Sequence, residues 1–311
     1  MIVYGPVPSR RLGSSVGINN IPSKKCSYSC VYCQIGNTKE YVIEPDEFYG
    51  LEEILTAVQM KLLEAREKCI KVDFLTLVAN GEPSLDINLG FLIDRLKKFN
   101  IPLALITNSS LLTKSDVRRK LLKVDWISVK VDAVDEQIWK KIDRPYKDLN
   151  LHDILDSIVF FRKRFNGRFN TETMLIRDLN DSQEHLDSLA DYLTRVKPDI
   201  AYLSVPIRPP AQSWVQIPSD NSLCKAFRIL KDKNINVELN NCYEGNDFKP
   251  INDIESELVA ITSVHPMRED AVMEFLKKGN CSYSVVNKLI QANILYVNKY
   301  NGTNYYSRKI K

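Results

Sequence analysis

The sequence lacks the features that would place the chain in a membrane or on an export route. No uninterrupted apolar stretch in its 311 residues approaches the roughly 20 residues of a membrane-spanning helix. Arg10 and Arg11 lie near the start, but no apolar run follows a basic start, so no signal peptide is expected. The net charge of +4 is too small to indicate nucleic acid binding without a localised patch. We therefore expect a cytoplasmic protein with no membrane partner.

Internal repeats and low-complexity tracts are also missing. A hydrophobic share of 44% and a charged share of 26% are ordinary globular values, which excludes a disordered or fibrous chain. The length allows one large domain or two moderate ones with a sizeable core. Histidine is scarce: His152, His185 and His265 are isolated in the sequence, and none is expected to be catalytic.

Short β-rich segments alternate with amphipathic helical segments between about residues 16 and 240. The expected strands are residues 16–21, 72–78, 103–107, 126–131, 171–176 and 201–205. Apolar residues recur at helical spacing between them. This alternation indicates an α/β fold of parallel β/α units, and right-handed crossovers then give a doubly wound sheet or a full or partial barrel.

The alternation ends near residue 250, which predicts a first domain of residues 1–250 and a second of residues 251–311. In the second domain, two short helical segments precede an alternating segment with a strong hairpin signal. These are residues 270–278, 283–292 and 295–310, the last with Asn301-Gly302. Helix, helix and hairpin in this order resemble a winged-helix module.

A winged helix can bind DNA or RNA through its second helix, and in enzymes it can also dock a peptide or protein. Here the second helix carries Lys288 as its single cation, whereas the hairpin and tail carry Lys299, Arg308, Lys309 and Lys311 with no acid between them. Phosphate contacts need several such charges. The sequence leaves RNA, DNA and peptide docking open as functions of this module.

Cysteine use is the most informative feature of the composition. Seven cysteines, an odd number, argue against a disulfide framework in a chain with no export signal. Three of them, Cys26, Cys30 and Cys33, fall within eight residues. The other four, Cys69, Cys224, Cys242 and Cys281, are expected to be buried thiols. The last three could in principle hold a second cluster, but their spacing matches no pattern.

The spacing of Cys26, Cys30 and Cys33 favours an iron–sulfur site. Electron-transfer clusters usually take four cysteines, so three close ligands leave one iron without a protein ligand and open to a substrate. The segment directly follows an expected strand, which places it at the ligand-binding end of a parallel sheet. A structural zinc knuckle with a fourth ligand, or chance clustering of buried cysteines, are the alternatives.

The motif C-x-x-x-C-x-aromatic-C, with Tyr32 as the aromatic residue, resembles the signature of the radical S-adenosylmethionine (SAM) enzymes. The resemblance covers most of residues 5–210. It implies a partial (β/α)6 barrel whose [4Fe-4S] cluster is held by the three cysteines, with Tyr32 at the cofactor. It also implies that one electron, from a donor such as flavodoxin or ferredoxin, cleaves SAM to methionine and a 5′-deoxyadenosyl radical that takes a hydrogen atom from a substrate.

Residues suited to a polar ligand follow the second and third expected strands. Residues 80–83 combine a glycine, which permits close backbone approach, with an acid that can accept hydrogen bonds from an ammonium group. The resemblance implies that Gly81 and Glu82 hold the amino group of SAM, with an ordinary Gly-Pro turn as the alternative. Thr107 and Asn108 suit a ribose or a carboxylate, although both residue types also form turns.

The fourth expected strand places Ser128, Lys130 and Asp132 on one face by alternation. Charged residues inside a barrel are costly unless they are paired or bind a ligand. We expect Ser128 to contact the cofactor and Lys130 and Asp132 to take part in catalysis. A structural Lys130–Asp132 pair, or a solvated outer face, are the alternatives.

Arginines mark the remaining strand ends. Arg177 follows the fifth expected strand and is a natural partner for the SAM carboxylate, or else a surface residue. Arg208 follows the sixth, where two prolines stiffen the loop and could aim it at the substrate as a catalytic residue. The paired Arg10 and Arg11 would suit an anionic small molecule, with a solvated basic turn as the alternative.

Three segments together resemble a branch of uncharacterised radical SAM proteins that is similar to the enzymes building the tricyclic wyosine base in tRNA. They are residues 8–13, the cysteine segment and residues 132–145. Those enzymes carry a second cluster from cysteines upstream of the signature, whereas this chain has no cysteine before Cys26. The sequence therefore leaves the substrate open.

A regulator is the alternative class of function, with an iron–sulfur cluster as redox sensor and the winged helix as DNA reader. A regulator has no use for polar residues at six strand ends or for an open iron, so the sequence favours the enzyme.

Overall fold

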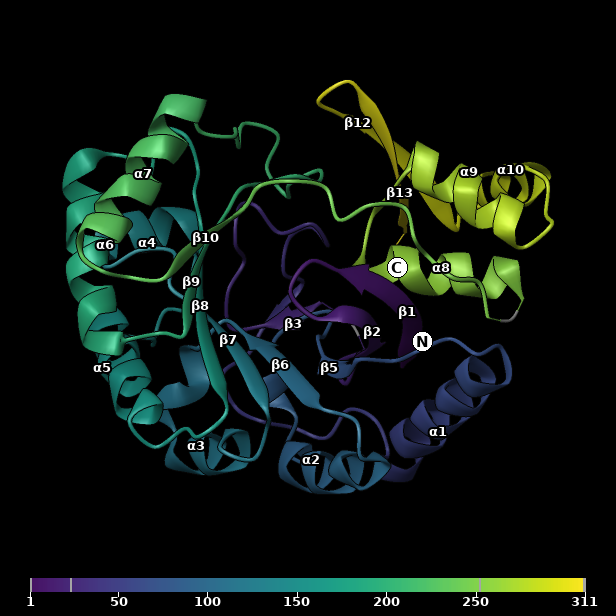
Figure 1. Cartoon of the computed structure of the whole chain (residues 1–311), viewed down its shortest axis with the longest axis horizontal. Coiled ribbons are helices and arrows are strands. Elements are labelled where there is room, and N and C mark those ends of the chain that lie inside the picture. Colours follow the sequence, from purple (N-terminus) through teal and green to yellow (C-terminus); the bar gives the residue numbers. More distant parts are fainter. Residues whose placement is uncertain (1, 23, 252, 310–311) are drawn as a thin grey trace.

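A mixed sheet with helices on its outer side forms the body of the molecule (Figure 1). The computed structural model describes residues 2–22, 24–251 and 253–309. The sheet has eight strands, in the spatial order β1 (Val3–Ser9), β2 (Gly13–Ile18), β5 (Phe74–Leu77), β6 (Leu103–Thr107), β7 (Trp126–Lys130), β8 (Arg168–Met174), β9 (Ile200–Ser204) and β10 (Val237–Asn240). β1 pairs with β2 antiparallel, and all other neighbours are parallel.

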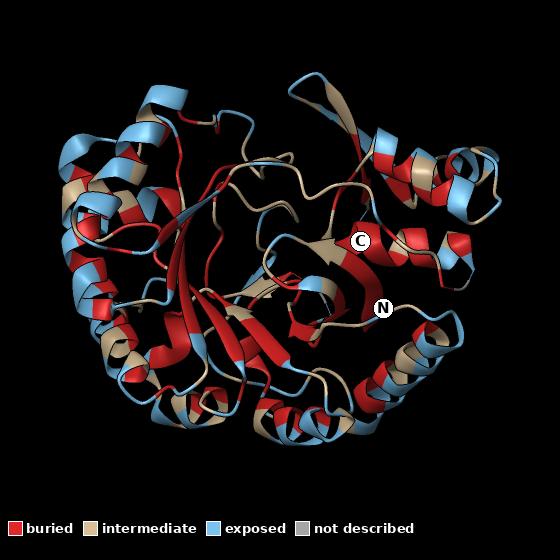
Figure 2. Ribbon diagram, viewed as in Figure 1, coloured by how far each residue is buried: buried red, intermediate tan, exposed pale blue. Residues whose placement is uncertain are grey.

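Seven helices connect these strands and cover the sheet. They are α1 (Leu51–Glu67), α2 (Leu89–Leu96), α3 (Ser115–Leu121), α4 (Glu136–Ile142), α5 (Leu151–Arg162), α6 (Gln183–Val196) and α7 (Asp220–Asp232). Each buries one apolar stripe; in α2, Leu89, Leu92, Ile93 and Leu96 are all buried. The central strands are buried on both faces, as parallel strands beneath helices must be (Figure 2).

The expected parallel α/β architecture is confirmed, but the expected number of strands is too small. All six expected strands are present, with ends displaced by up to three residues. β1 and β10 were not predicted from the sequence. Pro6 and Pro8 interrupt the strand pattern of β1, yet an edge strand tolerates proline because one side of it makes no ladder bonds. β10 has only four residues, of which Glu238 and Leu239 are exposed.

The C-terminal part contains three helices and a three-stranded antiparallel sheet. Its elements are α8 (Ile254–Val264), β11 (Met267–Arg268), α9 (Glu269–Lys278), α10 (Ser284–Gln291), β12 (Leu295–Tyr300) and β13 (Thr303–Arg308). The predicted hairpin is confirmed, since Tyr300 pairs with Thr303 across Asn301-Gly302. α8 was not predicted. Its Leu258 and Ile261 are buried in one apolar cluster with Tyr4 and Val7 of β1, which ties this part to the main sheet.

Two further short strands, β3 (Lys25–Cys26) and β4 (Glu40–Tyr41), pair with each other and frame the segment that contains the clustered cysteines. None of the described helices has the length and apolarity needed to cross a bilayer.

Candidate functional site

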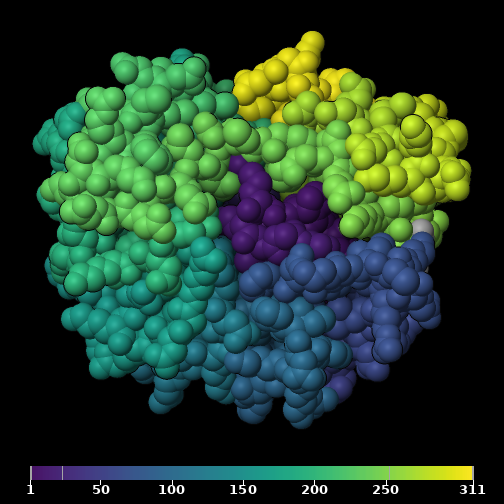
Figure 3. All heavy atoms as spheres, viewed as in Figure 1, coloured from purple at the N-terminus to yellow at the C-terminus, as the bar shows by residue number. Residues whose placement is uncertain are grey.

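A cavity of about 380 Å³ joins the carboxyl ends of the parallel strands, the N-terminal strands and the C-terminal part. Figure 3 shows the N-terminal residues at the centre of one face, bordered by later segments of the chain. Most of the residues expected at the site from sequence line this cavity: Cys26, Tyr32, Cys30, Cys33, Gly81, Glu82, Thr107, Asn108, Lys130 and Arg208, together with Arg10 and Arg11.

The clustered cysteines lie on a loop, residues 26–36, which we call the cysteine loop. Backbone hydrogen bonds fasten it to the end of α4: Val31 N–H donates to the Ile142 carbonyl at 2.8 Å and Ser29 N–H to the Asp143 carbonyl at 2.9 Å. The three thiols are free and half-buried. The loop is therefore fixed by contacts of its backbone, which leaves the thiols available to a ligand in the cavity.

The surroundings of Cys26 and Cys30 disfavour thiolate in the protein alone. Burial and the nearby Glu82 carboxylate raise the pKa of Cys26 to about 12. Burial and Asp143 raise the pKa of Cys30 well above its ordinary value. A cation does contact Cys33, since the Lys24 Nζ donates to its Sγ at 2.9 Å. Bound iron would supply the positive charge that thiolates need here, and thiolate is the usual ligand of iron–sulfur clusters.

Within the described ranges, no group of three or more His, Cys, Asp or Glu side chains is arranged to hold a single metal ion. A cubane cluster is larger than one ion, so its ligands stand further apart. The clustered candidate ligands at the cavity are three thiols, with no acid or imidazole in the same segment. Thiolate ligands are the ones that iron–sulfur clusters take, so these residues fit such a cluster.

Glu82 is a buried carboxylate whose partners are all neutral. Its Oε1 accepts from Ser84 N–H at 3.0 Å, from the Ser84 hydroxyl at 2.6 Å and from the Thr107 hydroxyl at 2.7 Å, and its Oε2 accepts from Asn108 N–H at 2.7 Å. Burial raises the pKa of Glu82, and these hydrogen bonds oppose that rise. A carboxylate facing a cavity with no cation on it is suited to an ammonium group.

Gly81 lets the β5 loop approach the cysteine loop. A Cβ at this position would lie 1.7 Å from the carbonyl oxygen of Lys25, the residue before Cys26. Glu82 N–H donates to the same carbonyl at 3.3 Å. The close approach that glycine permits is thus an approach of two backbone segments, and it brings Glu82 beside the first cysteine.

Thr107 and Asn108 connect these two segments. In addition to their bonds to Glu82, the Asn108 amide donates to the Ser27 hydroxyl at 2.9 Å and contacts the Cys26 Sγ at 3.5 Å. Thr107 and Asn108, which were expected to touch a ribose or carboxylate of a ligand, therefore also hold the Glu82 carboxylate in place beside the cysteine loop.

A second group of charges lies at the ends of β7 and β8. Lys130 Nζ lies 3.9 Å from Asp132 Oδ1 and 3.7 Å from Glu172 Oε1. It also lies 4.8 Å from the centre of the Tyr32 ring. Among the described residues it has no hydrogen-bond partner. Asp132 is buried, accepts from the Tyr32 hydroxyl and from Met174 N–H, and does not line the cavity. Lys130 and Asp132 thus face each other as the structural pair that was the alternative, and a role for them in catalysis stays a prediction.

Glu172 was missed by the sequence analysis. Arg11 donates to its Oε2 at 2.9 Å and to the Ser128 hydroxyl at 3.3 Å, and Ser204 donates to Oε1 at 2.8 Å. Ser128 therefore meets Arg11 rather than the cavity itself. Burial alone would raise the pKa of Glu172, but Arg11 and Lys130 hold it well below its ordinary value.

A third group joins Arg208, which was expected at the site, to Glu244 and His265, which the sequence analysis missed. Arg208 donates to Glu244, and the His265 Nε2 lies 2.7 Å from Glu244 and 3.0 Å from the Arg208 guanidinium. Burial and the nearby arginines lower the pKa of His265 well below its ordinary value, so the imidazole is neutral. Among the residues that the structure describes, Arg208 Nε and Glu244 Oε2 have no hydrogen-bond partner. Arg208 lies 36 positions from Glu244 and 57 positions from His265 in the sequence. No sequence motif connects residues so far apart, so only the fold reveals this group.

Some expected residues lie elsewhere. Arg177 is exposed outside the cavity and donates to Gln216 at 3.0 Å. The expectation of buried thiols is wrong for Cys69, Cys224 and Cys242, which are exposed, while Cys281 is half-buried against the C-terminal apolar cluster. Cys69 follows the last turn of α1 in a left-handed conformation, so the helical stripe does not include it.

Comparisons with known proteins agree with this geometry. The sequence model of the Radical SAM superfamily matches residues 20–190. The chain is 43% identical over its whole length to a UPF0026 protein of Methanocaldococcus jannaschii, covering 97% of that protein.

Solved structures show the same fold at low identity. A radical SAM methyltransferase from Sphaerobacter thermophilus matches with a TM-score of 0.58 at 16% identity, over 73% of this chain and 66% of that one. TYW1 with a lysine–pyruvate adduct bound matches with a TM-score of 0.55 at 16% identity, over 71% of this chain and 75% of that one. The mixed α/β fold with a parallel sheet, the cysteine loop at its carboxyl ends and the family match agree: this chain belongs to the radical SAM superfamily.

Proposed function

We propose that the chain is an enzyme that binds a [4Fe-4S] cluster through Cys26, Cys30 and Cys33 and binds SAM beside it. One observation carries the proposal. The same cavity is lined by three thiols that have no fourth clustered ligand and by one buried carboxylate, Glu82, whose hydrogen-bond partners include no cation. Held by these thiols and reduced by one electron, such a cluster would supply the chemistry that splits SAM into methionine and a 5′-deoxyadenosyl radical, which would take a hydrogen atom from the substrate.

The residues of the chain position these groups. Glu82 accepts hydrogen bonds from the amino group of SAM, and Thr107 and Asn108 hold the Glu82 carboxylate in place. Tyr32 is fixed by its hydroxyl, which donates to Asp132, and its ring is held against Lys130. In the observed conformation Arg177 is turned toward Gln216, so it is not part of the proposed SAM site.

The substrate occupies the end of the cavity farther from Glu82 in our proposal. Arg10, Arg11, Lys130 and Arg208 line the cavity, and although Glu172 and Glu244 pair with three of them, the cations outnumber these two acids, which favours an anionic substrate. A small anionic molecule, tRNA or a peptide each remains compatible with that charge. The order of α8, α9, α10 and the β12–β13 hairpin supports our further proposal that residues 251–311 form a winged-helix docking module.

Anaerobic reconstitution with iron and sulfide, followed by dithionite and SAM, tests the proposal. Wild-type protein should release 5′-deoxyadenosine and methionine, and Cys30→Ala should release neither. Cys224→Ala is the matched control because that thiol is exposed on α7, and it should keep iron content and product formation. Equal product from wild type and Cys30→Ala would overturn the assignment.

A further inference from the structure

A second cavity, of about 600 Å³, lies between the cysteine loop and the C-terminal part. Residues 34–39 form one side of it, and α8, β12 and β13 form the other. We call it the basic groove. It is distinct from the site cavity but adjoins it, since Gln34 and Ile35 line both.

The charge of the basic groove has one sign. Lys24, Lys39, Arg308 and Lys309 line it, and no Asp or Glu does so among residues 2–22, 24–251 and 253–309. Apolar surface lies between these cations, contributed by Ile35, Pro266 and the 40% exposed Tyr296. Apolar surface within a charged rim is typical of a protein interface.

The groove reaches one ligand of the proposed cluster. Lys24 lines it, and its Nζ donates both to Cys33 Sγ at 2.9 Å and to the Gly36 carbonyl. Gln34, the next residue after Cys33, lines both the groove and the site cavity. Its amide donates to the Val264 carbonyl at 2.8 Å and accepts from Arg208 at 3.2 Å. An electron can pass from the groove to this ligand, Cys33, through packed side chains, without any atom being transferred.

We propose that the basic groove is the docking surface of a small acidic one-electron donor protein. The proposal rests on the proposed function, which needs one electron from outside the chain. In the step, the reduced donor is oxidised by one electron and the cluster is reduced by one electron, with no atom transferred. Opposite charge steers such a donor to the groove, and redox encounters need only a small contact area.

A nucleic acid is the competing occupant, because Tyr296 could stack on a base between the same cations. The contact of Lys24 with Cys33 favours the redox partner, because it places the groove beside a ligand of the proposed cluster, whereas a nucleic acid substrate must reach the site cavity. Lys24 is buried and bonded to Cys33 and Gly36, so it adds to the positive field of the groove without contacting an occupant. That field steers an acidic protein, whereas a nucleic acid needs several direct phosphate contacts.

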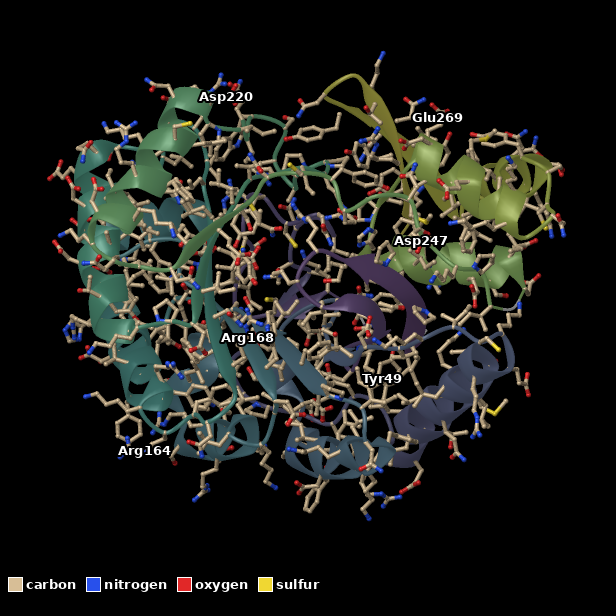
Figure 4. The ribbon with its side chains drawn as sticks, in the orientation of Figure 1. Tyr49, Arg164, Arg168, Asp220, Asp247 and Glu269 are labelled. Carbon is tan, nitrogen blue, oxygen red and sulfur yellow. The ribbon has the colours of Figure 1, made fainter. Side chains whose placement is uncertain are left out.

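Binding of reduced and oxidised flavodoxin to the full chain tests the proposal directly. Arg308→Glu/Lys309→Glu should weaken flavodoxin binding at least about tenfold in 50 mM salt, and 300 mM salt should weaken wild-type binding by a similar factor. The neutral variant Arg308→Gln/Lys309→Gln should bind flavodoxin with an affinity between those of the wild type and the charge-reversed variant. Lys225→Glu is the matched control, because it reverses an exposed charge on α7. Figure 4 labels Asp220, the first residue of α7, and Glu269, the first residue of α9, at separate places on the molecule.

Product formation then separates this proposal from the proposed function. With flavodoxin as reductant, Arg308→Glu/Lys309→Glu should form 5′-deoxyadenosine about tenfold more slowly at limiting flavodoxin, while its rate with dithionite stays that of wild type. Absence of product with dithionite in every variant would refute the proposed function, and the binding assay would still decide the docking surface. Unchanged flavodoxin binding in the charge-reversed variant, with or without a loss of RNA oligonucleotide binding, would overturn the proposal.

Discussion

Glu82 shows how a single carboxylate can be kept ready for a cation. Its four hydrogen bonds come from neutral donors on the loops after β5 and β6, so the charge is held in place without being neutralised. Burial makes such a charge costly, and a bound ammonium group would relieve that cost.

The first prediction concerns this residue. Glu82→Gln should lower SAM affinity by about 10- to 100-fold, because a hydrogen bond to a charged group contributes roughly 1.5–3 kcal/mol. Equilibrium dialysis of SAM against the reconstituted protein measures the change. Glu67→Gln, on an exposed turn of α1, is the control and should bind as wild type does. SAM binding unaffected by Glu82→Gln would remove this residue from the site.

Glu172 has the opposite environment, since two cations face it. Arg11 and Lys130 lower its pKa below the ordinary value of 4.5 even though burial acts to raise it. A depressed carboxyl pKa stabilises the fold above the pKa of the unfolded chain, and this contribution is lost as the pH falls through the folded pKa.

A pH-dependent stability difference follows. Glu172→Gln should lower the free energy of unfolding by about 3 kcal/mol at pH 7, because it leaves two buried cations with one partner fewer. The difference from wild type should stay constant down to about pH 4.5 and shrink below it. Urea unfolding across this range measures it, with the exposed Glu238→Gln as control. A difference that grows on acidification would contradict the assigned ion pairs.

At the scale of elements, the site depends on how closely the β5 loop packs on the cysteine loop. Gly81→Ala places a methyl group on the Lys25 carbonyl, so one backbone segment must move. We expect a loss of roughly 1–3 kcal/mol of stability and reduced iron incorporation, because overpacking displaces the first cysteine. Thermal melting and iron analysis measure the two effects. Gly50→Ala, whose nearest neighbour atom is 3.9 Å away, should leave iron incorporation unchanged and should cost less stability, since only the N-cap of α1 changes.

The elements also show what sequence can and cannot predict. Strands β6 and β7 were predicted almost to the residue, because apolar runs of strand length are bounded by polar residues. The strand ends therefore placed Glu82, Asn108 and Lys130 in one cavity in advance. Glu244 and His265 could not be found this way, since their proximity depends on the path of the chain between β10 and α8.

At the scale of the whole molecule, the C-terminal part and the main sheet share one apolar cluster. Leu258 of α8 is fully buried in the cluster that includes Tyr4 and Val7 of β1. Leu258→Ala should therefore lower the free energy of unfolding by about 2–5 kcal/mol. Met273→Ala removes a comparable side chain from the exposed side of α9 and should cost far less. Chemical denaturation compares them; equal costs would show that this cluster contributes little.

The central claim is that three cysteines hold a cluster with one iron open to SAM. Electron paramagnetic resonance of the reduced, reconstituted protein, recorded with and without SAM, tests it most directly. We predict a [4Fe-4S]⁺ signal in wild type whose g values change when SAM is added, and no such signal in Cys30→Ala. A cluster signal that SAM leaves unaltered, or one that persists without Cys30, would contradict the account.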